Sequence, residues 1–331
     1  MKHLNVSVLT NPEQLKSLQA ADGLVLLPIE EWNRLKPDGH IIVESSGKVV
    51  ACCSVWKSSL PTLAGEQPAA IGHFQSTDTH SGQAALERAC SYLQRSGMKR
   101  VVGPINANTW NKYRLVTYSN GRAPFFLEPT NPEHYVKAWK NVGFDTFAEY
   151  QSTIMAPQTE IDARLSKVQN RLKDAGVCIR NLNPNDFESE LDRMHELSCE
   201  SFRNNLLYTP IRKDDFVEIY RPFKEKLNTD AVWLAEHDGA CVGYLFSVPD
   251  YNQLNEAAFV DTLIVKTLAI SPQRLYAGLG LLLLHRCHQY AAAKGFRHLI
   301  HALMIPNNRM KHFGRESSEC LRAYTLLSQN L

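Results

Sequence analysis

Two distant segments of this 331-residue chain follow the same order of helix, glycine and strand. Residues 90–102 read as a helix end, a stop at Gly97 and an apolar strand, and residues 288–300 repeat the order around Gly295. Glycine suits the left-handed position that commonly ends a helix. Upstream, each half has two strand-like runs joined through a turn, at Gly47 in one half and at Asp238-Gly239 in the other. The repetition predicts two copies of one domain and excludes a solenoid.

The length agrees with two domains of roughly 150 residues each, every one large enough to bury its own core. The strand-like segment 149–153 closes the first copy, and Ala156-Pro157-Gln158 forms a short linker. A polar helix is expected over 161–175, and another over 194–202. We therefore predict domains at 1–157 and 158–331.

Composition excludes several classes of protein. The net charge of +2 argues against a dedicated nucleic-acid binder. No apolar run approaches the ~18 residues of a membrane-spanning helix, and the first residues do not read as a signal peptide. The eight cysteines are scattered without a Cys-x-x-Cys pair, so we expect small core residues in a reducing compartment. These features predict a cytoplasmic monomer or homodimer with no membrane or nucleic-acid partner.

The most informative stretch for chemistry spans residues 259–308. An apolar run over 259–270 ends at Ser271-Pro272, a loop with Gly278 and Gly280 follows, and a helix is expected from about residue 281 to 293. A glycine loop at a helix N-terminus offers free amides that hold a pyrophosphate. A Walker loop is absent, and Leu283 stands where a dinucleotide fingerprint needs its third glycine. A tight turn without any ligand is the alternative.

This stretch resembles the GNAT superfamily of acyl-CoA-dependent N-acyltransferases. The strand end Leu268-Ala269-Ile270-Ser271-Pro272 and the loop 275–280 match the family signature. Leu275 stands where the family has Gln or Arg, with Arg274 beside it, and Asn308 matches an asparagine that faces the cofactor. The resemblance implies an α+β fold in which a mixed central sheet is flanked by helices.

The whole chain also resembles a tandem-GNAT group of uncharacterised bacterial proteins. The matching segments are Gly103-Pro104-Ile105-Asn106, Asn131-Pro132, Gly143-Phe144, 266–269 and 301–304. Two tandem GNAT-like domains are therefore expected. The first half carries Asp78 in the place of the phosphate loop, and an acid repels phosphate, so we expect CoA in the second domain only. The first domain would be a degenerate copy.

The resemblance implies acetyl-CoA as acyl donor. Three strand residues are expected at the pantetheine, namely Leu268, Ala269 and Ile270. The other expected cofactor contacts are Arg274, Leu275, Tyr276, Ala277, Gly278, Leu279, Gly280 and Asn308.

The reaction implied by the resemblance is direct transfer of the acyl group to a small amine or amino acid, which requires a base for the amine. Asp261 and Glu256 are candidates, each equally readable as a solvated carboxylate at a strand end. His301 is a further candidate that also reads as a core histidine. Many family members place a tyrosine that acts as an acid shortly after the asparagine, and this tyrosine is missing here. Tyr324 is a candidate to replace it, and it also reads as a packed residue.

Two other functions compete with this interpretation. One is a non-catalytic protein that binds or senses acyl-CoA. The other is an aminoacyltransferase that uses charged tRNA, against which the near-neutral charge counts.

Other patterns are weaker. His285, Cys287 and His288 resemble metal ligands, but the cysteine points elsewhere on a helix, so no metal is expected. Two further groups could line an acceptor pocket. They are the aromatic residues Trp110, Tyr113, Phe125, Phe126, Tyr135 and Trp139, and the loop residues Arg203, Asn204, Asn205 and Tyr208.

Overall fold

The computed structural model describes residues 3–161, 163–221, 224, 227–255, 259–305 and 318–331. Within these residues the strands form one 13-stranded mixed sheet in the order β1-β2-β3-β4-β5-β13-β7-β12-β11-β10-β9-β8, with β6 paired to β13. The strands of the first half are β1 (Asn5–Leu9), β2 (Gly39–Ser45), β3 (Lys48–Trp56), β4 (Ala69–Ser76), β5 (Arg100–Gly103), β6 (Leu115–Ser119) and β7 (Asp145–Met155). Those of the second are β8 (Cys178–Asn181), β9 (Val232–His237), β10 (Ala240–Pro249), β11 (Thr262–Ile270), β12 (His298–Met304) and β13 (Glu319–Asn330).

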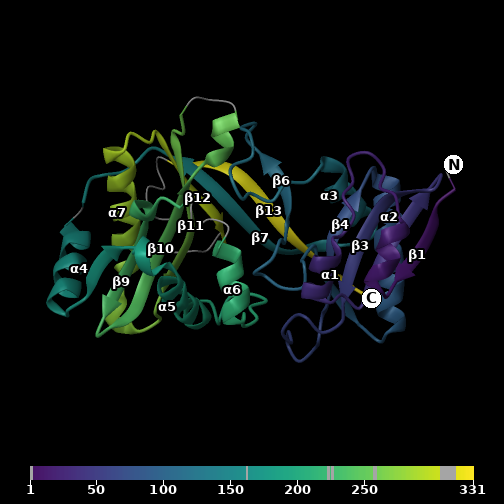
Figure 1. Ribbon diagram of the computed structural model, residues 1–331, viewed down its shortest axis with the longest axis horizontal. Coiled ribbons are helices and arrows are strands. Elements are labelled where there is room, and N and C mark those ends of the chain that lie inside the picture. Colours follow the sequence, from purple (N-terminus) through teal and green to yellow (C-terminus); the bar gives the residue numbers. More distant parts are fainter. Residues whose placement is uncertain (1–2, 162, 222–223, 225–226, 256–258, 306–317) are drawn as a thin grey trace.

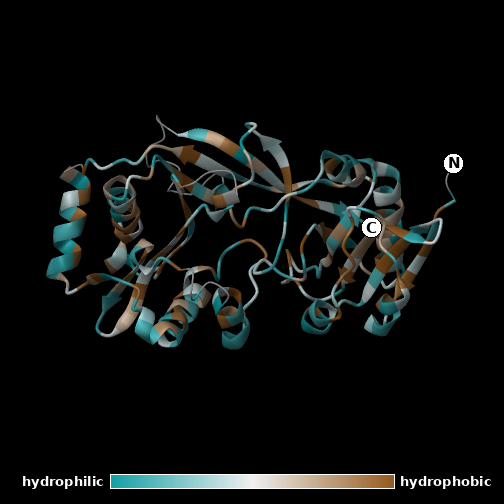
Figure 2. Ribbon diagram, turned by 45° about the horizontal axis from the view of Figure 1, so that its top comes forward, coloured by the Kyte–Doolittle hydropathy of each residue, from teal (hydrophilic) through white to brown (hydrophobic). Residues whose placement is uncertain are grey.

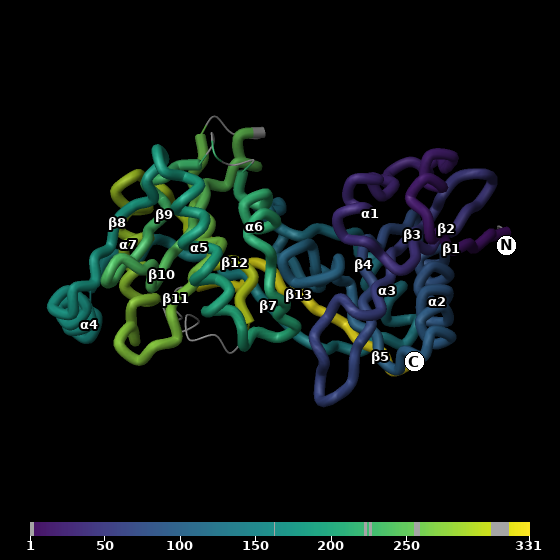
Figure 3. The backbone as a smooth tube through the Cα atoms, turned by 60° about the horizontal axis from the view of Figure 1, so that its bottom comes forward, coloured from purple at the N-terminus to yellow at the C-terminus, as the bar shows by residue number. Residues whose placement is uncertain are grey.

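Two long strands connect the halves, which lie side by side in Figure 1. The last strand, β13, inserts between β5 and β7, whereas β7 pairs along its other edge with β12. The C-terminal strand thus completes the sheet of the first half, and the last strand of the first half completes the sheet of the second. Figure 3 shows β7 and β13 crossing between the halves from another direction. The boundary near residue 157 stays a prediction, and β13 lies beyond it.

Helices cover both faces of the sheet in the second half. These helices are α4 (Ala163–Asp174), α5 (Phe187–Ser201), α6 (Lys213–Tyr220) and α7 (Leu279–Ala293). One core joins α5 and α6 to the sheet, and a second joins α4 and α7 to its other face. In Figure 2 the strands are largely brown and the outer helices carry teal stripes, which is the amphipathic pattern of helices on a buried sheet.

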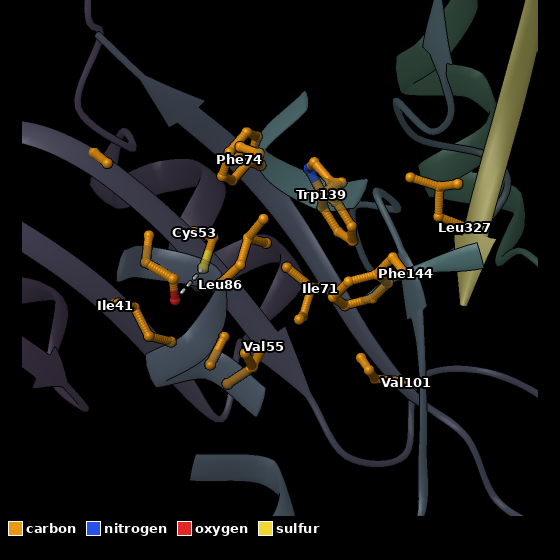
Figure 4. Close-up of a cluster of buried hydrophobic side chains, with 14 of the residues drawn as sticks. Ile41, Cys53, Val55, Ile71, Phe74, Leu86, Val101, Trp139, Phe144 and Leu327 are labelled. Atoms are coloured by element: carbon orange, nitrogen blue, oxygen red, sulfur yellow. Dashed lines mark hydrogen bonds between the residues drawn. The ribbon is translucent and has the colours of Figure 1, made fainter. Parts of the chain in front are cut away.

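The first half packs α1 (Ile29–Leu35), α2 (Thr79–Arg95) and α3 (Glu133–Asn141) on its strands. Its core gathers Phe74, Trp139 and Phe144 around the strands (Figure 4). Leu327 of β13 is fully buried in this same cluster. The core of the first half is therefore built partly from the last residues of the chain.

The repeat predicted from sequence is confirmed. Helix α2 precedes β5 as α7 precedes β12, and both hairpin turns have positive φ at their two central residues, including Asp238 at 50° and Gly239 at 77°. Some predicted bounds were wrong. Helix α7 begins at Leu279 instead of residue 281, because Gly278 takes the left-handed N-cap position, and α5 begins at Phe187 instead of residue 194.

Short 3-10 segments link these elements: η1 (Pro12–Ser17), η2 (Pro184–Asp186), η4 (Thr229–Ala231), η5 (Tyr251–Asn255) and η6 (Arg274–Tyr276). No helix among the described residues is long and apolar enough to cross a membrane. All eight cysteines are free. Cys52, Cys53 and Cys287 are buried as expected, whereas Cys178 and Cys320 are exposed.

Candidate active site

The parallel strands β11 and β12 separate part-way along their length. They pair from Thr262 opposite His298 to Val265 opposite His301, and no further pair joins them although β11 continues to Ile270. Lys266 is the extra residue of a β-bulge against β10 at the point of separation. The two strands therefore leave an opening between their carboxyl-terminal ends.

The N-terminus of α7 lies beyond the end of β11. Gly278 is its N-cap with φ of 90°, and no side chain caps the helix. Among the described hydrogen bonds, none uses the amides of Gly278, Leu279 or Gly280. Free amides and the positive end of the helix dipole form a site for an anion, here at the position predicted for pyrophosphate.

Helix α4 braces this loop from outside. The guanidinium of Arg171 donates to the carbonyl of Leu275 at 3.1 Å and to that of Ala277. The side chain of Val168 packs so closely on Gly278 that an added Cβ would lie 2.8 Å from it. Arg171 thus brings a positive charge to a loop whose own sequence lacks the family's Gln or Arg. Sequence reasoning missed it because more than 100 positions separate it from the loop.

Arg171→Met is expected to weaken CoA binding roughly tenfold, because it removes both a charge beside the anion site and two bonds that hold the loop. Calorimetry with CoA measures the effect. Lys173→Met is the control, because Lys173 is exposed on the same helix and its substitution also removes one positive charge. Equal binding by both variants would contradict a role for Arg171.

The predicted pantetheine residues lie along the separated part of β11. Leu268 lines a groove, Ala269 is buried, and the amide of Ile270 already donates to Ser201 Oγ at 3.2 Å. In the loop, Arg274, Leu275 and Ala277 are exposed, whereas Tyr276 is buried and its hydroxyl lies 2.9 Å from His237 Nδ1. These cofactor contacts stay predictions. Asn308 lies outside the described residues.

A groove of about 1330 Å³ lies between the halves and is lined by both. Its second-half wall includes Val265–Leu268 and His301–Ile305, so it meets the opening between β11 and β12. Five of the predicted acceptor residues lie on its wall: Trp110, Tyr113, Tyr135, Asn205 and Tyr208. Phe125 and Trp139 are instead buried in the cores, because burying a large aromatic ring is strongly favourable.

The equivalent opening of the first half is closed. The amide of Ile105 donates to Ile71 at 2.8 Å, and Asn106 Oδ1 accepts from the amide of His73 at 2.7 Å. Asp78 caps α2 by accepting from the amide of Ser81 at 2.8 Å. The Gly-Pro-x-Asn segment thus fills the opening of the first half, and Asp78 occupies the position of the anion site. Both features favour a first half that binds no CoA.

Two of the candidate catalytic residues lie in unsuitable places. Asp261 precedes β11, at the opposite end of the strand from the opening, and its carboxylate accepts from Gln253 and Thr262. These hydrogen bonds and nearby cations lower its pKa. Tyr324 is buried, and its hydroxyl donates to Glu128 at 2.6 Å and lies 3.0 Å from Ser152 Oγ. Burial raises the pKa of Tyr324.

His301 lies on the wall of the groove but belongs to a buried pair. The amide of Gln158 donates to His288 Nδ1 at 3.0 Å, so His288 carries its proton on Nε2 and donates to His301 Nε2 at 3.1 Å. Burial lowers the pKa of His288 to about 3 and that of His301 to about 4. Both rings are neutral near pH 7. Glu256 lies outside the described residues.

The histidines of α7 have a structural task. His285 Nε2 lies 3.1 Å from the carbonyl of Thr159, and His288 accepts from Gln158, so the two rings hold the linker on the helix. No group of three potential metal ligands occurs among the described residues.

Comparison with known proteins supports the domain deduced from this geometry. Residues 191–315 match the acetyltransferase (GNAT) family. The curated "Bacterial ceramide synthase" of Caulobacter vibrioides is 23% identical over 190 residues, which are 53% of this chain and 49% of the relative. Protein YghO of Escherichia coli is 21% identical over 188 residues, 55% of this chain and 48% of the relative. The matched part is about half the length of these curated relatives.

Solved structures resemble nearly the whole chain. A GCN5-related N-acetyltransferase from Anabaena variabilis has a TM-score of 0.56 at 8% identity and covers 98% of this chain and 73% of its own. One from Sphaerobacter thermophilus has a TM-score of 0.50 at 13% identity and covers 99% and 95%. These likenesses show the fold. The fold is that of GNAT proteins over nearly the whole chain, and residues 191–315 match the model of that family.

Proposed function

We propose that this protein transfers an acyl group from acyl-CoA, with acetyl-CoA the donor to test first, to the nitrogen of a small amine or amino acid. The proposal rests chiefly on the opening between β11 and β12. This opening leads at one end to the free amides of α7 and at the other to the groove. A thioester in this opening would meet an acceptor in the groove.

In this proposal the neutral amine attacks the thioester carbonyl, a C–N bond forms, the C–S bond breaks and the thiolate leaves. The proton of the amine passes to solvent or to a base. The amides of α7 hold the pyrophosphate, and the edge of β11 holds the pantetheine. The His288–His301 pair stays neutral and shapes the wall of the opening.

The name of one curated relative favours nitrogen as the acceptor atom. A ceramide synthase forms an amide, and this chain matches about half of the relative that carries that name. The groove of about 1330 Å³ exceeds an ordinary small-molecule pocket of roughly 300–1,000 Å³, so it has room for both the acyl group and the acceptor.

Ala277→Glu provides the test. Ala277 is exposed beside the free amides, so a carboxylate there repels phosphate, whereas Ala277→Gln adds nearly the same volume without charge. We expect Glu to raise the Kd for acetyl-CoA by roughly tenfold or more, and Gln to change it little. Thiol release across a panel of amines and amino acids then measures transfer. Equal binding by the two variants would contradict the placement of the cofactor.

A non-catalytic acyl-CoA-binding protein is the second candidate. It is favoured by Tyr324, whose hydroxyl is held by Glu128 and Ser152 and does not reach for a leaving thiolate. Binding of acetyl-CoA and longer acyl-CoAs without thiol release for any acceptor would support this second function.

A further inference from the structure

Two buried or partly buried cations on the groove wall have no acidic partner among the described residues. Arg114 and Lys266 both line the groove, and neither lies within ion-pair distance of a described carboxylate. Arg322, by contrast, is paired with Glu128 at 3.2 Å. A buried charge without a counter-ion is costly, so its retention points to a ligand that supplies the counter-ion.

Arg114 comes from the first half and reaches the second. It is 7% exposed, and its guanidinium packs 3.9 Å from the ring centres of both Tyr113 and Tyr150. One of its five N–H groups donates to the carbonyl of Leu303 on β12, at 3.2 Å. No other hydrogen bond of this guanidinium is found among the described residues, and Arg114 lines the groove, so further donors are available to a ligand there. Burial lowers its pKa to about 10, which leaves it charged near neutral pH.

Lys266 stands on the opposite side of the opening, at the bulge of β11. Its ammonium donates to the carbonyl of Leu127 at 3.2 Å, one of three available N–H donors. Burial and the charge of Arg114 lower its pKa to about 8, while Glu128 opposes the shift. The two cations thus lie near each other, one anchored to β12 and one on β11.

Two nearby acids in the described part of the chain are engaged elsewhere. Glu128 is bound by Arg322, Tyr324 and the amide of Phe125, and burial raises its pKa. Asp250 accepts from the amide of Phe126 at 2.8 Å. Neither is an ion-pair partner of Arg114 or Lys266.

We propose that Arg114 and Lys266 bind the carboxylate of the acceptor, which makes an amino acid the substrate class. The inference rests on the proposed transfer function and narrows its acceptor. Arginine suits a carboxylate because its planar fork makes two parallel hydrogen bonds. A carboxylate held between β11 and β12 places the adjacent α-amino group beside the opening where the thioester is expected. The aromatic and apolar wall of the groove would take the side chain of the amino acid.

The test compares each amino acid with the amine that lacks its carboxylate. Leucine against 3-methylbutylamine and phenylalanine against phenethylamine are the probes, with thiol release as the assay. The wild-type protein should prefer the amino acid in kcat/KM. Arg114→Met should reduce this preference by roughly 30-fold or more, and Lys266→Met should reduce it by a smaller factor. Arg114→Lys should give an intermediate preference, because it keeps the charge and loses the fork.

Arg34→Met is the matched control. Arg34 lines the same groove but is already engaged by Glu31 and Asn111, so the preference should stay unchanged. A second measurement does not depend on the variants folding: N-acetyl-leucine should raise the melting temperature of the wild-type protein more than N-acetyl-leucinamide. Equal acylation of amines and amino acids, or equal shifts by both compounds, would overturn the carboxylate site. Absence of transfer to every acceptor, with the N-acetyl-leucine shift intact, would overturn the proposed function alone.

Discussion

Removal of residues 319–331 is expected to unfold both halves of the protein, not merely the second. The removed strand β13 pairs with β5 and β7, and it buries four side chains to 1% exposure or less: Leu321, Tyr324, Leu326 and Leu327. Truncating one buried leucine to alanine costs about 2–5 kcal/mol, against a total stability of about 5–15 kcal/mol for a typical protein. The shortened chain therefore has too little stability left for a folded first half.

Point variants give a graded version of this experiment. Leu327 belongs to the core of the first half and Leu321 to a core of the second half, although the two residues lie only six positions apart on one strand. Leu327→Ala and Leu321→Ala should each lower the same unfolding transition by about 2–5 kcal/mol. Trp139 lies in the core of the first half and Trp233 in a core of the second. The fluorescence of variants that keep only one of these tryptophans can therefore follow the unfolding of each half.

Leu86→Ala is the control, since Leu86 is buried wholly within the first half on α2. In a cooperative molecule it also shifts the common transition. Two separate transitions, of which Leu327→Ala moves only that of the first half, would show that the exchanged strand does not couple the halves.

The exchange of strands could not be read from the sequence. Repeated helix, glycine and strand segments depend on local periodicity and turn chemistry, so they were predictable. Which strand lies beside which depends on pairing between residues far apart, such as Leu327 with Gly103. A boundary at a Pro-containing linker is a sound local inference, yet a strand beyond it belongs to the sheet of the first half.

The candidate site divides in the same way. The loop 275–280 was predictable because its glycines and the following helix are contiguous, and the structure places them at one end of the opening. Arg171 and Arg114 could not be found this way, because each acts on carbonyls of a distant segment. The sequence also suggested a catalytic role for Tyr324, a polar residue within an apolar run. In the structure its hydroxyl belongs to a buried hydrogen-bond network.

Mild acid is expected to destabilise the protein strongly, because three histidines are buried in the neutral form. Burial lowers the pKa of His40 and of His288 to about 3 and that of His301 to about 4, against an ordinary value near 6.5. Below pH 6.5 the unfolded chain binds protons that the folded chain refuses, so stability falls as the pH falls toward 4. Each histidine contributes about 1.4 kcal/mol per pH unit over this window.

Urea unfolding at pH 7 and pH 5 measures this loss, which should reach several kcal/mol. His40→Asn is the diagnostic variant, because the asparagine amide can replace Nδ1, which lies 2.8 Å from Ser54 Oγ, while it cannot titrate. Unfolding of the variant should take up about one proton fewer, so its free energy of unfolding should depend less steeply on pH. The raised pKa of Glu128 acts in the opposite direction, and the lowered pKa values of Glu31 and Asp261 matter chiefly nearer pH 4. Equal stability at pH 7 and pH 5 would mean that water or a rearrangement admits charge to these buried rings.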